Sequence, residues 1–120
     1  MKILFLADSD QPGESGVGDY ALVLSESLRA FSIDSTVECI GSPNSSLRSS
    51  LVARLNEFRP DWVSFQFVPY AYAERGLVGR DTFPWQQLRG RIGTHLMFHE
   101  LWIGAHKGAS LRDRAIGALQ

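Results

Sequence analysis

The sequence predicts an α/β protein whose parallel sheet is flanked by helices. Apolar runs of strand length alternate along the chain with segments whose apolar residues recur at helical spacing. The strand-like runs are nearly continuous in their apolar residues, which is typical of strands covered on both faces. Alternation of strands and helices in the order βαβαβ favours a parallel sheet with right-handed crossovers and the first strand near its centre.

The first strand is expected at residues 3–7, an apolar run that ends at Asp8. A glycine-containing turn at 11–19 separates it from a helix. This helix is expected to pack on the sheet through one stripe of residues at helical spacing: Tyr20, Leu24, Leu28 and Phe31.

The second strand is expected at 36–40, followed by a turn at 41–44. Ser45 or Ser46 is the predicted cap of the next helix, which ends before Pro60. Its predicted buried stripe consists of Leu47, Leu51, Leu55 and Phe58.

The third strand is expected at 62–68. Residues 70–90 are interpreted as a surface loop, with a short helix near 85–88 as an option within it. Strand character returns at 91–100, and 111–119 has the pattern of a further helix.

Length and composition predict one soluble globular domain, with 120 residues, 44% hydrophobic residues and a formal net charge of −1. The charge balance does not favour nucleic acid as a partner. No apolar run approaches the ~18 residues that span a bilayer, and Met1 leads directly into a strand, so a cytoplasmic location is expected. Cys39, the single cysteine, is expected to be a buried and inert thiol, which is compatible with a reducing compartment.

The glycine-containing turn is the most informative local feature. Gly13, Gly16 and Gly18 permit positive φ and let a ligand approach bare backbone, while the following helix start offers unpaired N–H groups. A phosphate, a sugar or a similar oxygen-rich ligand fits such a turn. A plain tight turn before a helix is an equal alternative. For Asp19, capping of the helix is preferred over contact with an acceptor hydroxyl.

Ligands of parallel α/β sheets bind beyond the carboxyl ends of the strands. Asp8, the glycine turn, Tyr70 and the pair His99 and Glu100 all lie at those predicted ends. In the fourth strand His95, Met97 and His99 share one face, and Leu96 and Phe98 share the other.

With these residues in place, the chain resembles the N-terminal domain of retaining glycosyltransferases built from two Rossmann-like domains, the large family 4 group. Its Gly16-Val17-Gly18-Asp19-Tyr20 segment resembles the first loop and helix of that family, and Pro60-Asp61-Trp62-Val63 through Gln66-Phe67-Val68-Pro69-Tyr70 resembles its third strand. Met97-Phe98-His99-Glu100-Leu101-Trp102 resembles the strand whose terminal histidine faces the cleft. The order and spacing of these segments extend the resemblance along nearly the whole chain.

The resemblance implies transfer of a sugar from a nucleotide-sugar donor to an acceptor with retention. Donor contacts in that family lie mainly in a C-terminal domain, and its paired glutamates separated by seven residues do not occur in this sequence. The expectation is therefore an incomplete Rossmann-like N-terminal, acceptor-side domain that is inactive alone. An uncovered sheet edge or apolar face would then favour a homo-oligomer.

By the same resemblance His99 is the expected catalytic residue, contacting the transferred sugar or polarising its surroundings; a satisfied, partly buried histidine is the alternative. The expected substrate-binding residues are Gly16, Val17, Gly18, Asp19, Gln66, Tyr70 and Glu100. Neither a cofactor nor a metal is expected. His95 and His99 would lie about 13 Å apart along a strand, too far to hold one ion.

Three other functions were compared with this one. A nicotinamide-binding dehydrogenase prefers glycines spaced G-x-G-x-x-G, whereas this chain has the opposite spacing, although Glu38 falls about 20 residues further on. A response-regulator-like module would use Asp8 and Asp10 but needs an aspartate after the third strand, where Val68 and Pro69 stand. A non-catalytic binding or self-association module is the runner-up.

Overall fold

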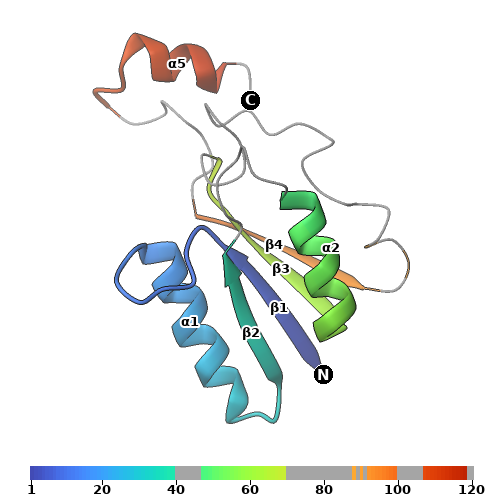
Figure 1. Cartoon of the computed structure of the whole chain (residues 1–120). Helices are drawn as coiled ribbons and strands as arrows, with labels where there is room; N and C mark the ends of the chain where they lie inside the picture. The colour runs from blue at the N-terminus through green and yellow to red at the C-terminus, as the bar shows by residue number, and fades with distance from the viewer. Residues whose placement is uncertain (40–46, 70–87, 89, 91, 100–106, 119–120) are drawn as a thin grey trace.

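The computed structural model describes residues 1–39, 47–69, 88, 90, 92–99 and 107–118. Its elements alternate in the predicted order, with the bounds β1 (Lys2–Ala7), α1 (Gly16–Arg29), β2 (Asp34–Cys39), α2 (Leu47–Phe58), β3 (Trp62–Phe67), β4 (Gly93–Phe98) and α5 (Leu111–Gly117). Figure 1 shows α1 and α2 flanking the sheet, with α5 set beyond one end of it.

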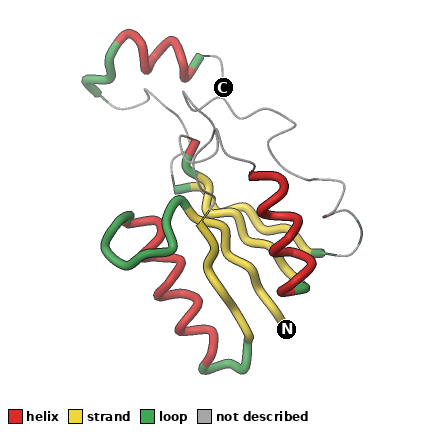
Figure 2. Tube along the Cα trace, in the orientation of Figure 1, coloured by secondary structure: helices red, strands yellow, loops and turns green. Residues whose placement is uncertain are grey.

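The four described strands form one parallel sheet in the order β2-β1-β3-β4. This confirms the predicted α/β class, a Rossmann-like parallel sheet with flanking helices and the first strand in its interior. Because every pairing is parallel, the carboxyl ends of the strands meet at one edge of the sheet, whose strands lie side by side in Figure 2 (yellow). In the register, Phe5 of β1 pairs with Val37 of β2 and with Ser64 of β3.

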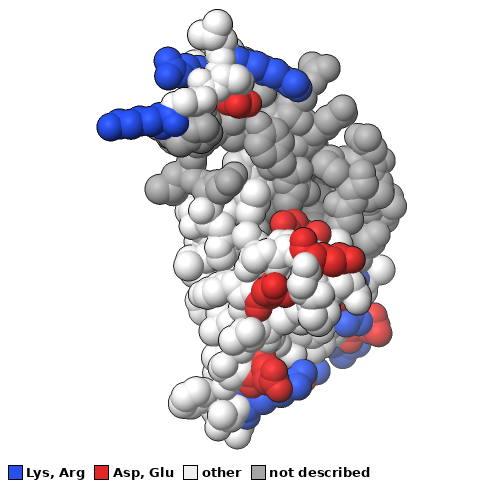
Figure 3. Space-filling view, turned by 90° about the vertical axis from the view of Figure 1, so that its left-hand side faces the viewer, with Lys and Arg blue, Asp and Glu red and all other residues white. Residues whose placement is uncertain are grey.

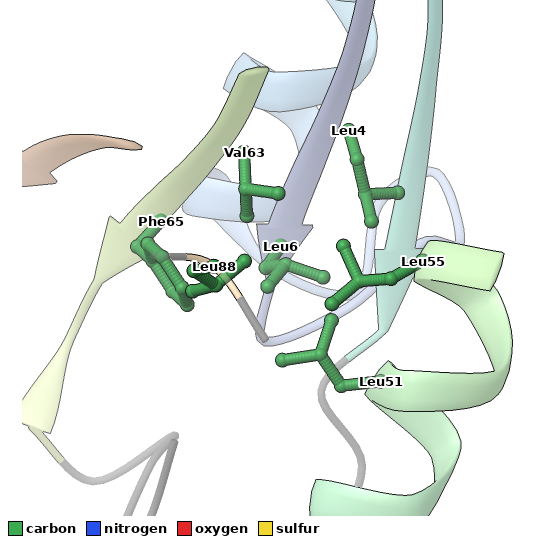
Figure 4. Packing of buried hydrophobic residues seen from close by; sticks show 7 residues of the cluster. All are labelled: Leu4, Leu6, Leu51, Leu55, Val63, Phe65 and Leu88. Carbon is green, nitrogen blue, oxygen red and sulfur yellow. The ribbon is translucent and has the colours of Figure 1, made fainter. Parts of the chain in front are cut away.

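The larger core lies between the sheet and α2. Figure 4 shows two leucines of α2 pointing at the side chains of β1 and β3. The cluster consists of Leu4, Leu6, Leu51, Leu55, Val63, Phe65 and Leu88, each at most 6% exposed. Alternate residues of a strand point to opposite faces, so the even-numbered residues of β1 and the odd-numbered residues of β3 make this core. The predicted α2 stripe is therefore confirmed at Leu51, Leu55 and the half-buried Phe58.

Among the described elements, α1 covers the opposite face over β1 and β2. Phe5, Ala7 and Ala21 are buried there, and Leu24 and Leu28 pack against them. Where the same face continues onto β3 and β4, Trp62 remains 45% exposed. A cavity of about 460 Å³ opens between α1 and these strands, lined by Met1, Ile3, Phe5, Leu24, Leu28, Trp62, Ser64 and His95.

Three sequence predictions about burial are wrong. Phe31 lies beyond the end of α1 and is 75% exposed, and Tyr20 is 42% exposed, so only the central leucines of the predicted stripe pack on the sheet. Cys39 is exposed as well, because it ends β2 at the sheet edge, where its thiol contacts the Asp8 carbonyl oxygen at 3.3 Å.

Several boundaries also differ from the prediction. β1 begins one residue earlier than the predicted strand, and β2 begins two residues earlier. In both strands the backbone pairing continues past the apolar side chains. The fourth strand is shorter than 91–100, and α5 ends before 119. Several predictions fall outside the described residues: the serine cap of α2, Tyr70 and Glu100. The same holds for the predicted loop at 70–90 with its optional helix, of which only residues 88 and 90 are described.

Within the described part of the chain, no helix has the length and apolar character needed to cross a membrane.

Candidate functional site

The glycine loop and the end of β4 meet at the carboxyl edge of the sheet. Tyr20 of α1 packs its ring against the imidazole of His99, with centroids 5.2 Å apart and planes at 71°. His99 follows directly on β4 and still pairs with β3, since its backbone N–H donates to the Phe67 carbonyl at 3.1 Å. The sheet order brings these two segments together although about eighty residues separate them in sequence.

Ser15 caps α1 and organises the loop before it. Its Oγ accepts hydrogen bonds from the backbone N–H groups of Val17 and Gly18, both at 3.1 Å. The same hydroxyl donates to Asp8 Oδ1 at 2.6 Å, which ties the helix start to the end of β1. A serine in extended conformation at this position satisfies donors that a helix start otherwise leaves unpaired.

This cap changes the role expected for the loop. Two of the three N–H groups predicted to face a ligand already donate to Ser15. The prediction that Asp19 caps the helix is wrong, because it lies in the first turn of α1 and accepts from the Gly13 N–H at 2.8 Å. Asp19 therefore closes the glycine turn onto the helix that follows.

The three glycines have three different structural roles. Gly13 has φ of +81°, a backbone conformation that favours glycine. Gly18 is buried against the Ser9 carbonyl oxygen, which a Cβ on Gly18 would approach to 2.5 Å. A Cβ on Gly16 would meet no atom within 4 Å. Gly13 and Gly16 thus border open space, as a position for ligand approach requires, whereas Gly18 does not.

Carboxylates dominate the electrostatics of the loop. Asp8, Asp10, Glu14 and Asp19 all lie within or beside it, and Glu14 accepts from the Ser9 hydroxyl at 2.7 Å. Within the described residues none of these four forms an ion pair with Lys or Arg. Figure 3 shows acidic side chains at the middle and lower part of the face, and basic side chains in the region of α5 and again near the bottom. Hydroxyl groups suit such a surface better than a diphosphate does.

The His99 ring is held by a hydrogen bond with the buried side chain of Gln66. His99 Nε2 lies 2.9 Å from Gln66 Oε1, and the Gln66 side chain is almost fully buried in β3. Two residues that the sequence placed in one site, His99 and Gln66, are therefore brought into direct contact. The amide is oriented in turn by Ser64, whose hydroxyl lies 2.8 Å from Gln66 Nε2.

Three members of this region were not predicted from the sequence: Ser15, Ser64 and the Tyr20 ring as a partner of His99. A serine before a helical run is a general cap signal and could have indicated Ser15. Ser64 has a recognisable signal too, because a polar residue two positions before Gln66 must share its sheet face. No local sequence pattern predicts the contact between Tyr20 and His99.

The acidic residue that favoured a dinucleotide site is already engaged. Glu38, near the end of β2, accepts from Arg54 Nε at 2.7 Å, and Arg54 also contacts Glu57 at 2.9 Å. The hydrogen bond to Glu57 raises the pKa of Arg54, the negative charge of Glu38 adds to this rise, and desolvation opposes both. The Glu38 carboxylate therefore serves to join β2 to α2.

Metal-ligating side chains do not cluster in the part of the chain that the structure describes, where no group of three such residues lies together. His95 and His99 instead bond to different residues of β3. No protein-family model matches the chain, and no curated protein sequence matches it. Fold and site together define a small α/β protein with a Rossmann-like parallel sheet and a polar carboxyl edge.

Loss of the Ser15 hydroxyl is expected to weaken the loop. Ser15→Ala removes the acceptor for two N–H groups and the donor to Asp8, so the free energy of unfolding should fall by about 1–2 kcal/mol. Urea denaturation followed by circular dichroism measures this. Ser27→Ala is the control, because that exposed hydroxyl bonds only the Val23 carbonyl within its own helix. Equal losses in the two variants would contradict a capping role for Ser15.

Proposed function

We propose that this chain forms the acceptor-side domain of a retaining glycosyltransferase that uses a nucleotide-sugar donor. The observation that carries the proposal is the contact between Tyr20 and His99, 5.2 Å between ring centroids. It joins the two segments that most resemble the family, the glycine loop and the histidine after the fourth strand, at the sheet edge where α/β proteins bind ligands. Resemblance in sequence supplies the reaction class.

In this proposal the loop recognises the acceptor rather than the donor phosphates. The N–H groups of Val17 and Gly18 are engaged by Ser15, and the surrounding side chains are carboxylates. Carboxylate oxygens accept hydrogen bonds from sugar or other alcohol hydroxyls, whereas they repel a diphosphate. The open space beside Gly16 is the approach route for that acceptor.

His99 is proposed to contact the transferred sugar. Its Nε2 is engaged by Gln66 and its ring plane is packed against Tyr20, so the ring is held in one orientation. A ring held in this way hydrogen-bonds a sugar hydroxyl without first losing side-chain entropy. Stabilisation of the departing diphosphate falls to a second, donor-binding domain in this proposal.

The direct test begins by reading the coding sequence past the codon for Gln120. The encoded protein is then assayed for nucleotide release from a panel of nucleotide sugars with candidate acceptors. His99→Ala is expected to lower the rate about tenfold or more, because a lost hydrogen bond of about 1.5 kcal/mol corresponds to that factor. Thr94→Ala is the control, since Thr94 is an exposed residue on the other face of β4.

Two results would overturn the proposal. One is the absence of turnover with every donor and acceptor, combined with no shift of Tyr20 or His99 resonances on addition of nucleotide sugar or acceptor. The other is full activity of His99→Ala.

Self-association is the second candidate function, favoured by apolar side chains that stay exposed around β4. Leu96 and Phe98 are 42% and 48% exposed on one face of β4, and Trp62 is 45% exposed on the other face of the sheet. Pairing of two copies through such residues would remove apolar area from water. Light scattering is expected to give an oligomer that Leu96→Glu dissociates. A monodisperse monomer for the parent chain would contradict this function.

A further inference from the structure

A row of four polar side chains crosses β3 and β4 on the α1 side of the sheet. His99 Nε2 lies 2.9 Å from Gln66 Oε1, and Gln66 Nε2 donates to Ser64 Oγ at 2.8 Å. Ser64 Oγ lies 2.8 Å from His95 Nδ1. The register explains the row, because Ser64 pairs with His95 and Gln66 pairs with Met97. His99 follows Met97 by two residues and therefore lies on the same face. Residues two apart on a strand share a face.

The orientation of the Gln66 amide gives this row a direction. Its oxygen faces His99, and a carboxamide oxygen is only an acceptor, so His99 must donate from Nε2. Its nitrogen faces Ser64, so the serine oxygen accepts from the amide. The one hydroxyl hydrogen of Ser64 is then available for His95 Nδ1.

Burial makes this arrangement selective. Gln66 and Ser64 are 1% and 3% exposed, so water cannot readily replace either partner. Reversing the amide would place its NH₂ group against the His99 N–H and its oxygen against the Ser64 oxygen. Both bonds recover only if His99 moves its proton to Nδ1 and the serine hydroxyl turns round. A buried polar group that faces a mismatched partner is disfavoured, because it loses its hydrogen bond to water and gains none in the protein.

We infer that Ser64 and Gln66 are positioning residues that hold the His99 proton on Nε2. The neutral ring then keeps Nδ1 as its hydrogen-bond acceptor for a ligand hydroxyl. The value of this tautomer for sugar recognition rests on the proposed function, but the tautomer itself does not. Tyr20 contributes the ring packing, and the row contributes the position of the proton.

Histidine ring ¹⁵N spectroscopy tests the inference on the chain as it is, without any ligand. Spectra are recorded at about pH 8, where histidine of ordinary pKa is neutral. For the parent chain, His99 is expected to give the pattern of a single Nε2–H tautomer. In Ser64→Ala the amide loses its hydrogen bond to the Ser64 hydroxyl, which favours its present orientation, so the Nδ1 and Nε2 shifts of His99 should move toward each other.

A matched variant separates positioning from simple loss of packing. Ser64→Thr retains a hydroxyl on Cβ and is expected to restore the parent pattern of His99. Backbone ¹H–¹⁵N spectra confirm that each variant is folded. If Ser64→Ala fails to fold, Gln66→Met replaces it, with the same expected change at His99.

Two outcomes would overturn the inference: a parent His99 protonated at Nδ1, or His99 shifts that stay unchanged in Ser64→Ala. Failure of the proposed function is distinguishable from either. If the parent chain has the predicted tautomer but its resonances do not respond to sugars, the positioning role of Ser64 and Gln66 is supported. The proposed glycosyltransferase function is then contradicted.

Discussion

Phe65→Ala is expected to lower the free energy of unfolding by about 3–5 kcal/mol, the largest effect of any substitution considered. Phe65 is fully buried in β3 and lies in the cluster that joins the sheet to α2. Truncation removes apolar area from the core and leaves a cavity that the rigid parallel strands cannot close. A domain of this size has about 5–15 kcal/mol in total, so the variant would approach instability at elevated temperature.

Phe31→Ala is the matched control, because the same atoms are removed from a side chain that is 75% exposed. Its free energy of unfolding should change by less than about 0.5 kcal/mol. Urea denaturation of both variants, with the slope of the transition compared, measures the difference. Similar losses for the two phenylalanines would mean that the core is not organised as in Figure 4.

Gly18→Ala is expected to destabilise the chain by about 1–2 kcal/mol, the overpacking cost less the helical gain of alanine, whereas Gly16→Ala should stabilise it slightly. Both positions are helical, where alanine is favoured over glycine by about 0.5–1 kcal/mol. At Gly18 the new Cβ would lie 2.5 Å from the Ser9 carbonyl oxygen, a backbone atom that cannot move without the loop. Such overpacking costs about 1–3 kcal/mol or more.

The opposite signs make the pair informative, since the two glycines are only two residues apart. Thermal and urea unfolding measure both variants. Gly16→Ala also adds a methyl group to the open side of the loop, so acceptor affinity should fall in this variant while stability does not. Destabilisation of both variants to the same extent would show that backbone freedom, rather than contact with Ser9, requires glycine at position 18.

The acidic character of the loop restricts which part of a transfer reaction it can serve. Asp8 and Glu14 accept from the hydroxyls of Ser15 and Ser9, Asp19 accepts from the Gly13 N–H, and Asp10 accepts from the Gln11 side-chain amide. A carboxylate that accepts one hydrogen bond retains lone pairs for further donors. In the proposed function, that combination suits a polyhydroxyl acceptor better than the phosphates of a donor.

Much of the fold could be predicted from the sequence because the relevant signals are local. Apolar runs of strand length predicted β1 and β3, and the spacing of Leu51 and Leu55 predicted the buried side of α2. Errors occurred where a local signal competes with position at an edge. Phe31 and Cys39 are apolar in character but lie past the last turn of α1 and at the end of an edge strand, where nothing in the described structure covers them.

The candidate site could be predicted only in part. His99 and Gln66 were identified from their places at strand ends, yet their contact depends on the register between β3 and β4. The glycine turn was recognised, but its three glycines could not be distinguished, because φ at Gly13 and the closeness of Gly18 to Ser9 are properties of the folded loop.

By itself the sequence determined the alternation of strands and helices, the parallel sheet and the side of α2 that is buried, since these follow from side-chain periodicity and short connections. Only the tertiary structure decided that Ser15 accepts hydrogen bonds from N–H groups at the start of α1 and that the Tyr20 ring contacts His99. It also decided that Gln66 bonds to both Ser64 and the His99 ring. The physical reason is that hydrogen bonds and ring contacts require atoms within a few ångströms, and strand register brings such atoms together from segments distant in sequence.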